Sequence, residues 1–301
     1  MTRETTIRTI TAETLRSLPL PDPAGGSKEA RGSALVIAGS VEVPGAAILA
    51  GTAALRAGAG KLQMSIAAGT APHAALAVPE ALVVRLPEGE DGHVDHAQAA
   101  EVLLPRTERA AAILIGAGMV SGEPTRALTA ALLSGPAQGP FVLDAASIDG
   151  LCEQAQAVRA RGGRVVLTPH AGEMARCLGW ERDAVEADPL AAARRAVELL
   201  GAVVVMKGAE TWIVDPAGDV WHYRGGGAGL ATSGSGDVLA GIIVGLLARG
   251  TTPAEAAAWG VFLHGEAGRR LARSCGPIGF LARELSGEVP GLMRDVAEGA
   301  I

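Results

Sequence analysis

The chain has 301 residues, of which 49% are apolar and only 3% are aromatic, so alanine, valine, leucine and isoleucine must fill the core. A net charge of −6, a pI near 5.6 and the scarcity of aromatic rings argue against proteins that bind nucleic acids or anionic membrane surfaces. The length suits one large α/β domain or two smaller ones.

The cysteines and the apolar runs indicate where the protein works. Cys152, Cys177 and Cys275 are far apart and form no Cys-x-x-Cys pair, which predicts free thiols in a reducing cytoplasm. Residues 1–10 are polar and lack the apolar segment of a signal peptide. The longest apolar run, 238–248, is too short to cross a membrane and is typical of a buried helix. The sequence therefore predicts a cytoplasmic protein.

Strands and helices alternate along the chain. Residues 1–32 are predicted to form an N-terminal helix, 12–18, and a linker rich in proline and glycine, and residues 33–301 form the main domain. The predicted strands, which are short, apolar and often β-branched, are 33–38, 61–66, 81–86, 111–115, 141–143, 164–167, 202–206 and a hairpin of 211–214 and 220–223. The predicted helices are 45–57, 95–104, 124–133, 147–160, 173–178, 189–200 and three that begin at 238, 253 and about 278.

This alternation predicts one doubly wound α/β domain. Strands that are apolar throughout belong in a mostly parallel sheet covered by helices on both faces, and roughly eight of them fit one sheet. Ligands of such sheets bind at the carboxyl ends of the strands. The polar residues and glycines that follow the predicted strands are Ser40, Gly116, Gly118, Asp144, Thr168, His170 and Lys207, together with Asp237 in the last loop.

The glycine-rich stretch 225–241 carries the clearest functional signal. It enters an apolar helix through Ser233-Gly234-Ser235-Gly236-Asp237. Glycines let a backbone approach a ligand closely, and the unpaired N–H groups at a helix N-terminus favour anions. A carboxylate is a poor phosphate contact, so Asp237 is interpreted as a base. The alternative is an ordinary loop in which Asp237 caps the helix.

Three other strand ends offer candidate residues with two interpretations each. His170 and Glu173 either face the ligand, or Thr168 caps a helix while Glu173 interacts with its dipole. Lys207 either meets a phosphate or is an exposed turn lysine. Asp144 either holds a metal or orients a polar group, or it caps the next helix.

The remaining histidines carry little functional signal. His264 is predicted to be an interior histidine with satisfied hydrogen bonds, on a helix. His73, His93, His96 and His222 are predicted to lie on the surface or in loops. The chain has no Walker A motif, complete dinucleotide fingerprint, Gly-x-Ser-x-Gly elbow or zinc-ligand spacing.

In combination these motifs resemble the ADP/ATP-dependent NAD(P)H-hydrate dehydratases of the ribokinase-like superfamily. The stretches that carry the resemblance, over about residues 33–270, are Gly39-Ser40, Pro44-Gly45-Ala46-Ala47, Leu114-Ile115-Gly116-Ala117-Gly118, Leu167-Thr168-Pro169-His170-Ala171-Gly172-Glu173-Met174, Lys207-Gly208-Ala209-Glu210-Thr211 and Gly234-Ser235-Gly236-Asp237. The resemblance implies a three-layer α/β sandwich with a mostly parallel central sheet flanked by helices.

The resemblance also implies an activity and a set of site residues. The family repairs the hydrates NADHX and NADPHX to NADH and NADPH at the expense of ADP or ATP, and it implies Mg²⁺, a homo-oligomer that is often a tetramer, and a cytoplasmic location. No metal ligand is assigned, and the two candidates are Asp144 and Glu173. By matching position, the adenylate would contact Lys207, Gly208, Ala209, Glu210, Thr211 and Gly236. The hydrated coenzyme would contact Ala46, Gly118, His170 and Asp237, with Asp237 as catalytic base and Ser233, Gly234, Ser235 and Gly236 as anion hole.

The chain departs from the family pattern in three places. Ala171 stands where the family has Pro, Ala146 stands where it has a second Asp, and residues 226–229 replace Gly-Asn-Pro-Gly. Two other classes of protein share these motifs: a ribokinase-like kinase of a small alcohol, and a non-catalytic nucleotide-binding relative. The His170 to Glu173 segment favours the dehydratase over the kinases, which more often have Asn-x-x-Glu.

Overall fold

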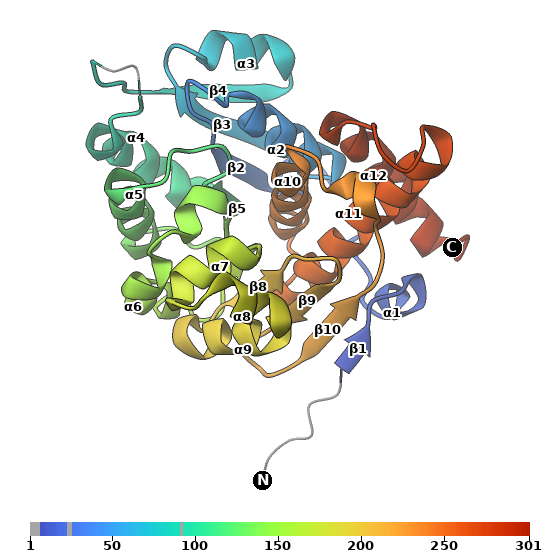
Figure 1. Cartoon of the computed structure of the whole chain (residues 1–301). Helices are drawn as coiled ribbons and strands as arrows, with labels where there is room; N and C mark the ends of the chain where they lie inside the picture. The colour runs from blue at the N-terminus through green and yellow to red at the C-terminus, as the bar shows by residue number, and fades with distance from the viewer. Residues whose placement is uncertain (1–6, 23–25, 91–92) are drawn as a thin grey trace.

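A computed structural model describes residues 7–22, 26–90 and 93–301 (Figure 1). Within these residues ten strands form one sheet in the order β1-β10-β9-β8-β7-β6-β5-β2-β3-β4. All neighbours are parallel except β9, which is antiparallel to β8 and β10. The strands are β1 (Ile7–Thr9), β2 (Ser33–Ile37), β3 (Lys61–Ala67), β4 (Ala81–Leu86), β5 (Ala112–Ile115), β6 (Phe141–Leu143), β7 (Val165–Leu167), β8 (Val203–Met206), β9 (Thr211–Val214) and β10 (Val220–Tyr223).

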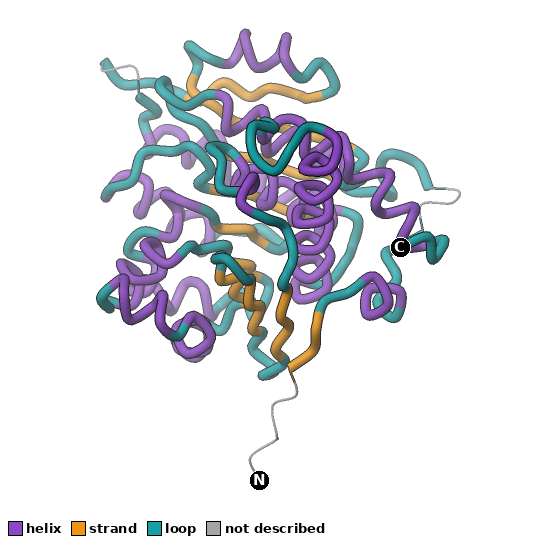
Figure 2. Tube along the Cα trace, turned by 45° about the vertical axis from the view of Figure 1, so that its right-hand side comes forward, coloured by secondary structure: helices purple, strands orange, loops and turns teal. Residues whose placement is uncertain are grey.

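Helices cover both faces of this sheet (Figures 1 and 2). One face packs against α2 (Gly45–Arg56), α3 (Ala71–Ala77), α10 (Ser235–Ala248), α11 (Pro253–Ser274) and α12 (Ala282–Ala297), with α1 (Ala12–Arg16) beside them. The other face packs against α4 (His96–Arg109), α5 (Glu123–Ser134), α6 (Ala155–Arg159), α7 (Ala171–Leu178), α8 (Arg182–Ala187) and α9 (Pro189–Leu200). None of the helices in the described part of the chain has the length and apolar character that a bilayer crossing requires.

The central strands are buried from both sides. In β2, Ala34 and Val36 join the core under α2 and α10, whereas Leu35 and Ile37 join the core under α4 and α5. Successive side chains of a strand point to opposite faces, so an apolar strand without alternation needs two covering layers. The predicted three-layer α/β sandwich with a mostly parallel sheet is therefore confirmed.

Most predicted elements are present with ends that differ by a few residues, but three elements were not predicted. Strand β1 is short and exposed, so it has no apolar signal, and α3 and α8 are short helices. Residues 147–160 form part of a 3₁₀ helix, η1 (Ala145–Ile148), then a second, η2 (Leu151–Gln154), and α6, rather than one helix.

The strand order reverses beside β2. The chain adds β3 and β4 on one side of β2 and then places β5 on its other side. Ligands of doubly wound folds bind outside the carboxyl ends of the strands at such a reversal. The turn after β2 and the turn after β5 are therefore expected to border a ligand.

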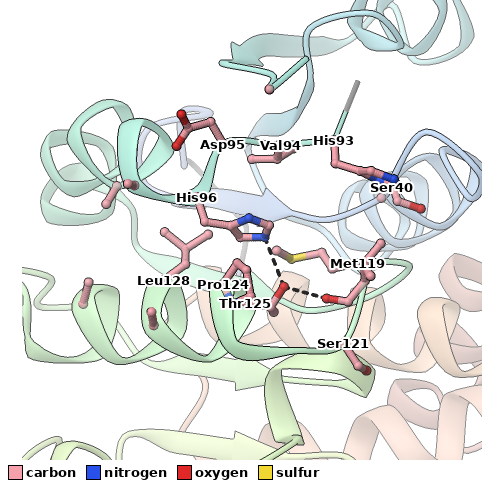
Figure 3. Close-up of a pocket in the computed structure, with 17 residues that line it drawn as sticks. Ser40, His93, Val94, Asp95, His96, Met119, Ser121, Pro124, Thr125 and Leu128 are labelled. Atoms are coloured by element: carbon pink, nitrogen blue, oxygen red, sulfur yellow. Dashed lines mark hydrogen bonds between the residues drawn. The ribbon is translucent and has the colours of Figure 1, made fainter. Parts of the chain in front are cut away.

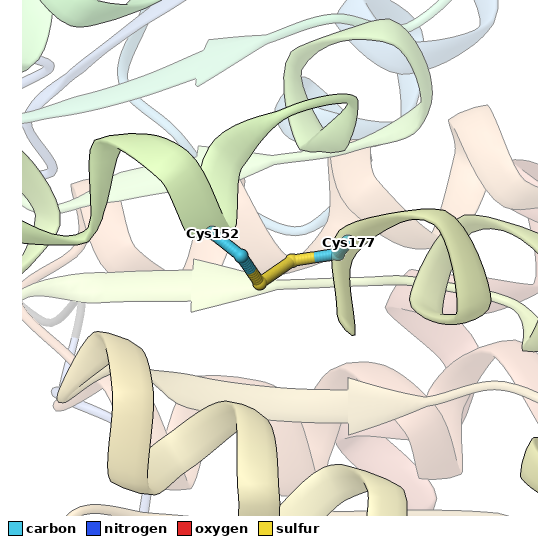
Figure 4. The surroundings of a disulfide bond; sticks show 2 residues. All are labelled: Cys152 and Cys177. Carbon is cyan, nitrogen blue, oxygen red and sulfur yellow. A yellow bond between two sulfur atoms is a disulfide. The ribbon is translucent and has the colours of Figure 1, made fainter. Parts of the chain in front are cut away.

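Two cysteines form a disulfide, so the prediction of free thiols is wrong for Cys152 and Cys177 (Figure 4). Cys152 lies in η2, which follows β6, and Cys177 lies in α7, which follows β7. Because β6 and β7 are neighbours in the sheet, the segments after them lie side by side. The separation of 25 residues conceals this proximity in the sequence. Cys275 is free, as predicted, and it is exposed.

Candidate active site

Asp144 organises the polar groups at the carboxyl ends of β6, β7 and β8. It is only 2% exposed. Its Oδ1 accepts hydrogen bonds from Thr168 Oγ1 at 2.7 Å and from Lys207 Nζ at 3.1 Å. The side chain makes no helix-capping hydrogen bond, so the alternative of a cap is wrong. Asp144 orients Lys207.

Lys207 is a partly buried cation held between two carboxylates. Its Nζ lies 3.1 Å from Asp144 Oδ1 and 3.9 Å from Glu173 Oε2. Burial on its own would lower the pKa of Lys207, but the charges of Asp144 and Glu173 outweigh it and raise that pKa. The lysine therefore stays protonated, and the alternative of an exposed turn lysine is wrong.

His170 caps α7. Its Nδ1 accepts hydrogen bonds from the backbone N–H groups of Gly172 at 3.0 Å and Glu173 at 3.3 Å. In return, Glu173 Oε2 accepts one from the His170 backbone N–H at 2.8 Å. This reciprocal capping box lets α7 begin at Ala171 without the family's proline, and Thr168 is not the cap.

The His170 ring remains available to a ligand. Its side chain is 56% exposed, with Nε2 3.3 Å from Glu173 Oε1. Burial of the other part of the ring lowers the pKa of His170, and the charge of Glu173 opposes this effect. Since Nδ1 accepts the capping bonds, the neutral ring carries its proton on Nε2.

Asp237 is the third residue of α10, so the alternative interpretation, in which it caps the helix, is wrong. The cap is Gly234, whose φ of +85° is a left-handed conformation that glycine adopts easily. Burial raises the pKa of Asp237 to about 7, with a further increase from the charge of Asp144, while Lys207 opposes both. A carboxyl group with this pKa can exchange a proton near neutral pH.

Gly236 lies against the lysine. A Cβ atom built on Gly236 would be 3.4 Å from Lys207 Nζ. Two residues predicted to bind the adenylate are thus brought together at the start of α10.

The packing of α2 against α10 places Ala46 beside Asp237. A Cβ on Gly241 would lie 2.3 Å from the carbonyl oxygen of Ala50, so the two helix backbones are in close contact. Four residues further along both helices, a Cβ on Gly245 would lie 2.4 Å from the oxygen of Ala54, so the helices run in the same direction. One turn before the first of these pairs stand Ala46 on α2 and Asp237 on α10.

Gly118 completes this cluster. A Cβ on Gly118 would lie only 2.4 Å from the Cβ of Ala46. The structure therefore places Gly118 against Ala46, and these are two of the residues that the family pattern assigns to the hydrated coenzyme. Helices α2 and α10 also direct their positive N-terminal ends to this edge of the sheet.

His264 supports the predicted anion hole through a contact that the sequence did not reveal. Ser235 Oγ lies 2.9 Å from His264 Nε2 on α11. Burial is the main cause that lowers the pKa of His264 to about 4, so the ring is neutral at neutral pH. His264 is a satisfied interior histidine, as predicted, and it fixes the Ser235 side chain.

Glu210 is directed away from Lys207 toward the β9–β10 hairpin. Its Oε2 lies 2.7 Å from His222 Nε2 and its Oε1 lies 3.2 Å from Arg224 Nε. The prediction that His222 lies on the surface is wrong, because it is 5% exposed and its ring stacks on Trp212 with centroids 3.7 Å apart. Gly208 and Ala209 are exposed in the turn before β9.

The departures from the family pattern fit the local backbone. Ala146 is buried, so an ionised acid at that position would lose its hydration. Gly227 adopts a φ of +125°, which glycine tolerates, and Ala228 begins the short 3₁₀ helix η3 (Ala228–Leu230), where a proline would also fit.

The described residues contain no group of three histidine, cysteine, aspartate or glutamate side chains arranged to hold a metal ion. Asp144 and Glu173, the two candidates, already bind Lys207. Magnesium sites commonly use one or two carboxylates together with substrate phosphates, so a nucleotide would have to supply most of the ligands.

The fold and this site define a ribokinase-like α/β protein. A ribokinase-like superfamily protein from Enterococcus faecalis matches the structure with a TM-score of 0.83 and 28% identity, covering 97% of each chain. Residues 34–291 match the NAD(P)H-hydrate dehydratase family, and the chain belongs to that family. The resemblance drawn from the motifs is therefore confirmed.

Two relatives are similar over nearly their whole length. The ADP-dependent (S)-NAD(P)H-hydrate dehydratase of Xanthomonas campestris is 47% identical over 294 residues, which is 97% of this chain and 98% of the relative. The ADP/ATP-dependent NAD(P)H-hydrate dehydratase of Bacillus subtilis, co-crystallised with ATP/Mg²⁺, has a TM-score of 0.83 and 31% identity and covers 97% of this chain and 99% of that chain.

Proposed function

We propose that the protein dehydrates the (6S)-hydrates of NADH and NADPH at the expense of ADP or ATP. The observation that carries this proposal is Asp237, a carboxyl group with a pKa of about 7 at the start of α10, where helix N–H groups favour anions. The names of the relatives from Xanthomonas campestris and Bacillus subtilis support the same activity.

In the proposed reaction Asp237 accepts the proton of the hydroxyl on carbon 6 of the reduced nicotinamide ring. The hydroxyl oxygen then attacks the terminal phosphorus of the nucleotide, and the bond to the leaving nucleotide breaks. The lone pair of the ring nitrogen next expels phosphate, and loss of a proton from carbon 5 restores the ring double bond. With ADP the products are AMP, phosphate and the working coenzyme.

The anion hole and Lys207 stabilise the charge that develops during phosphoryl transfer. The backbone of Ser233 to Gly236 approaches the transferring group, and one such donor is worth about 3–4 kcal/mol in comparable sites. Lys207 lies against Gly236, which supports adenylate contacts by residues 207–211 and Gly236. Magnesium, held mainly by the nucleotide phosphates, would neutralise their charge.

The Asp237→Asn variant tests the proposal. The wild-type protein, incubated with ADP or ATP and NADHX, should restore the absorbance of reduced nicotinamide. The variant should lose at least about 100-fold in kcat, because an amide cannot accept the hydroxyl proton. Asp215→Asn is the matched control, since Asp215 is also a buried carboxyl with a raised pKa but lies in the hairpin turn.

Three outcomes separate the alternatives. Near-normal turnover by Asp237→Asn would remove the base assignment. A stable phosphoester formed from another alcohol by the wild type would identify a kinase instead. Nucleotide binding without any turnover would identify a non-catalytic relative.

The proposal extends to assembly and location. A homo-oligomer, a tetramer by family resemblance, is supported by Leu76 on α3 and Leu82 on the edge strand β4, which are 84% and 58% exposed. Light scattering on the purified chain measures the oligomer.

For a cytoplasmic location, Cys152 and Cys177 would be reduced for much of the time, because disulfides persist mainly in oxidising compartments. Thiol alkylation in fractionated cells tests this.

A further inference from the structure

A cavity of about 750 Å³ lies between α4 and α5 beside the candidate active site (Figure 3). This volume is in the range of sites for small organic ligands. Residues from both helices and from the turns after β2 and β5 line it, among them Ser40, His96, Ala100, Met119, Thr125 and Leu128. The predicted surface or loop position of His96 is therefore wrong, because it is the first residue of α4 and faces this cavity.

The cavity lies next to the cluster of Ala46, Gly118 and Asp237. Met119, which follows Gly118, forms part of its wall, as does Gly39. The backbone N–H of Gly39 donates to the Ala117 carbonyl at 2.7 Å, which joins the turn after β2 to the turn after β5. The cavity thus occupies the strand-order reversal, where doubly wound folds bind ligands.

The cavity wall carries no lysine or arginine. His96 Nε2 lies 3.1 Å from Thr125 Oγ1, and the Thr125 hydroxyl donates to the Val120 carbonyl at 2.6 Å (Figure 3). His96 Nε2 is therefore the donor to Thr125. Burial lowers the pKa of His96, so its ring is neutral at neutral pH. A wall made mostly of apolar side chains and uncharged polar groups, with the carboxylate of Asp95 and no lysine or arginine, suits a nucleoside better than a phosphate.

We propose that this cavity binds the adenosine half of the hydrated dinucleotide, which is the half that does not react. This rests on the proposed function, which places the hydroxyl-bearing nicotinamide ring at Asp237. A dinucleotide has a second nucleoside across a pyrophosphate, and this cavity adjoins the cluster around Asp237 through Met119, which follows Gly118. The N-terminus of α2, which begins at Gly45, has no side-chain cap, and its positive end favours the pyrophosphate between the two halves.

Filling the cavity tests the proposal. Ala97 on α4 and Ala127 on α5 line it and are exposed, so tryptophan at either position can occupy the cavity without entering the core. Glu101→Trp is the matched control, because Glu101 is exposed on α4 and does not line the cavity. Ala97→Trp and Ala127→Trp should each raise KM for NADHX at least about 10-fold, with kcat and KM for ADP unchanged.

A truncated substrate separates adenosine binding from a general disturbance. The hydrate of reduced nicotinamide mononucleotide lacks the adenylate half, so the wild type and both cavity variants should convert it with equal kcat/KM. The proposal is overturned if the variants keep the wild-type KM for NADHX, or if they lose activity equally on both substrates.

A second measurement needs no variant. Without ADP, the product NADH should slow hydrogen exchange in the first turns of α4 and α5, whereas reduced nicotinamide mononucleotide should not. Protection confined to α2 and α10 would overturn the cavity assignment. A wild type that converts neither hydrate would overturn the proposed function, whereas an active wild type with unaffected variants would overturn this inference alone.

Discussion

At the scale of single residues, the charge of Asp144 contributes to the pKa of the proposed base, Asp237, and so to the pH dependence of the reaction. Asp237 must be ionised to accept a proton, so kcat/KM should rise with pH through its pKa of about 7. Burial is the largest cause of that raised pKa, and the charge of Asp144 adds to it. Asp144→Asn removes this charge, so the acid limb of the pH profile should move to lower pH.

Asp149→Asn is the control for this experiment, because Asp149 pairs with Arg176 and does not contribute to the pKa of Asp237. An acid limb at the same pH in wild type and Asp144→Asn would contradict the assignment. Asp144 also binds Lys207, so KM for ADP should rise in the same variant.

The residue scale is also where the sequence was least informative. The family pattern supplied Ala46, Gly118, His170, Lys207 and Asp237, and the structure brings them to one edge of the sheet. The pattern did not reveal that Asp144 holds Lys207 or that His264 holds Ser235, because each contact joins segments far apart in the chain. Side-chain partners of this kind follow from tertiary packing, which no local period or spacing encodes.

At the scale of elements, the close contact of α2 and α10 sets the distance between Ala46 and Asp237. A Cβ on Gly245 would lie 2.4 Å from the Ala54 carbonyl oxygen, so Gly245→Ala must push the helices apart. We expect a loss of about 2–4 kcal/mol in the free energy of unfolding, measured with urea, because neither backbone can yield locally. The displacement should also lower kcat/KM for NADHX.

Gly287→Ala on α12 is the matched control, because a Cβ there meets nothing within 4 Å. Alanine is favoured over glycine in a helix, so this variant should gain up to about 1 kcal/mol. Equal stability of the two variants would show that α2 and α10 tolerate separation.

The type of each long element could be predicted from apolar periodicity, whereas its neighbours in space could not. The apolar run of α10 predicted a buried helix but did not identify α2 as its partner. The same limit concealed the Cys152–Cys177 disulfide, since only the adjacency of β6 and β7 brings η2 and α7 together. His222 was misjudged because the aromatic stack with Trp212 exists only once β9 and β10 pair.

At the scale of the whole molecule, the alternation of strands and helices was enough to predict three layers and a ligand site at the carboxyl edge. The β1 end of the sheet was not predictable, because β1 pairs with β10 across more than two hundred residues. Short exposed strands have no apolar signal, so only their backbone partners define them. Strand β1 (Ile7–Thr9), which belongs to the segment that the sequence separated from the main domain, contributes this edge.

We propose that residues 33–301 contain the complete catalytic machinery and that residues 1–32 stabilise it. Leu15 is 1% exposed, Trp259 Nε1 donates to the Leu18 carbonyl at 2.7 Å, and Arg249 Nη2 donates to the Pro21 carbonyl at 2.9 Å. Removing residues 1–32 exposes the edge of β10 and leaves these donors without their acceptors. The shortened chain should lose about 3 kcal/mol or more in the free energy of unfolding.

Circular dichroism during urea unfolding measures this loss, and Trp259→Phe in the full chain is the control. That variant removes only the hydrogen bond to Leu18, so it should lose about 1 kcal/mol. Below its unfolding midpoint, the shortened chain should keep the wild-type kcat, because every proposed site residue lies after position 32. If the shortened chain kept the full free energy of unfolding, residues 1–32 would not stabilise the domain. If it folded but had no activity, part of the active site would lie within residues 1–32.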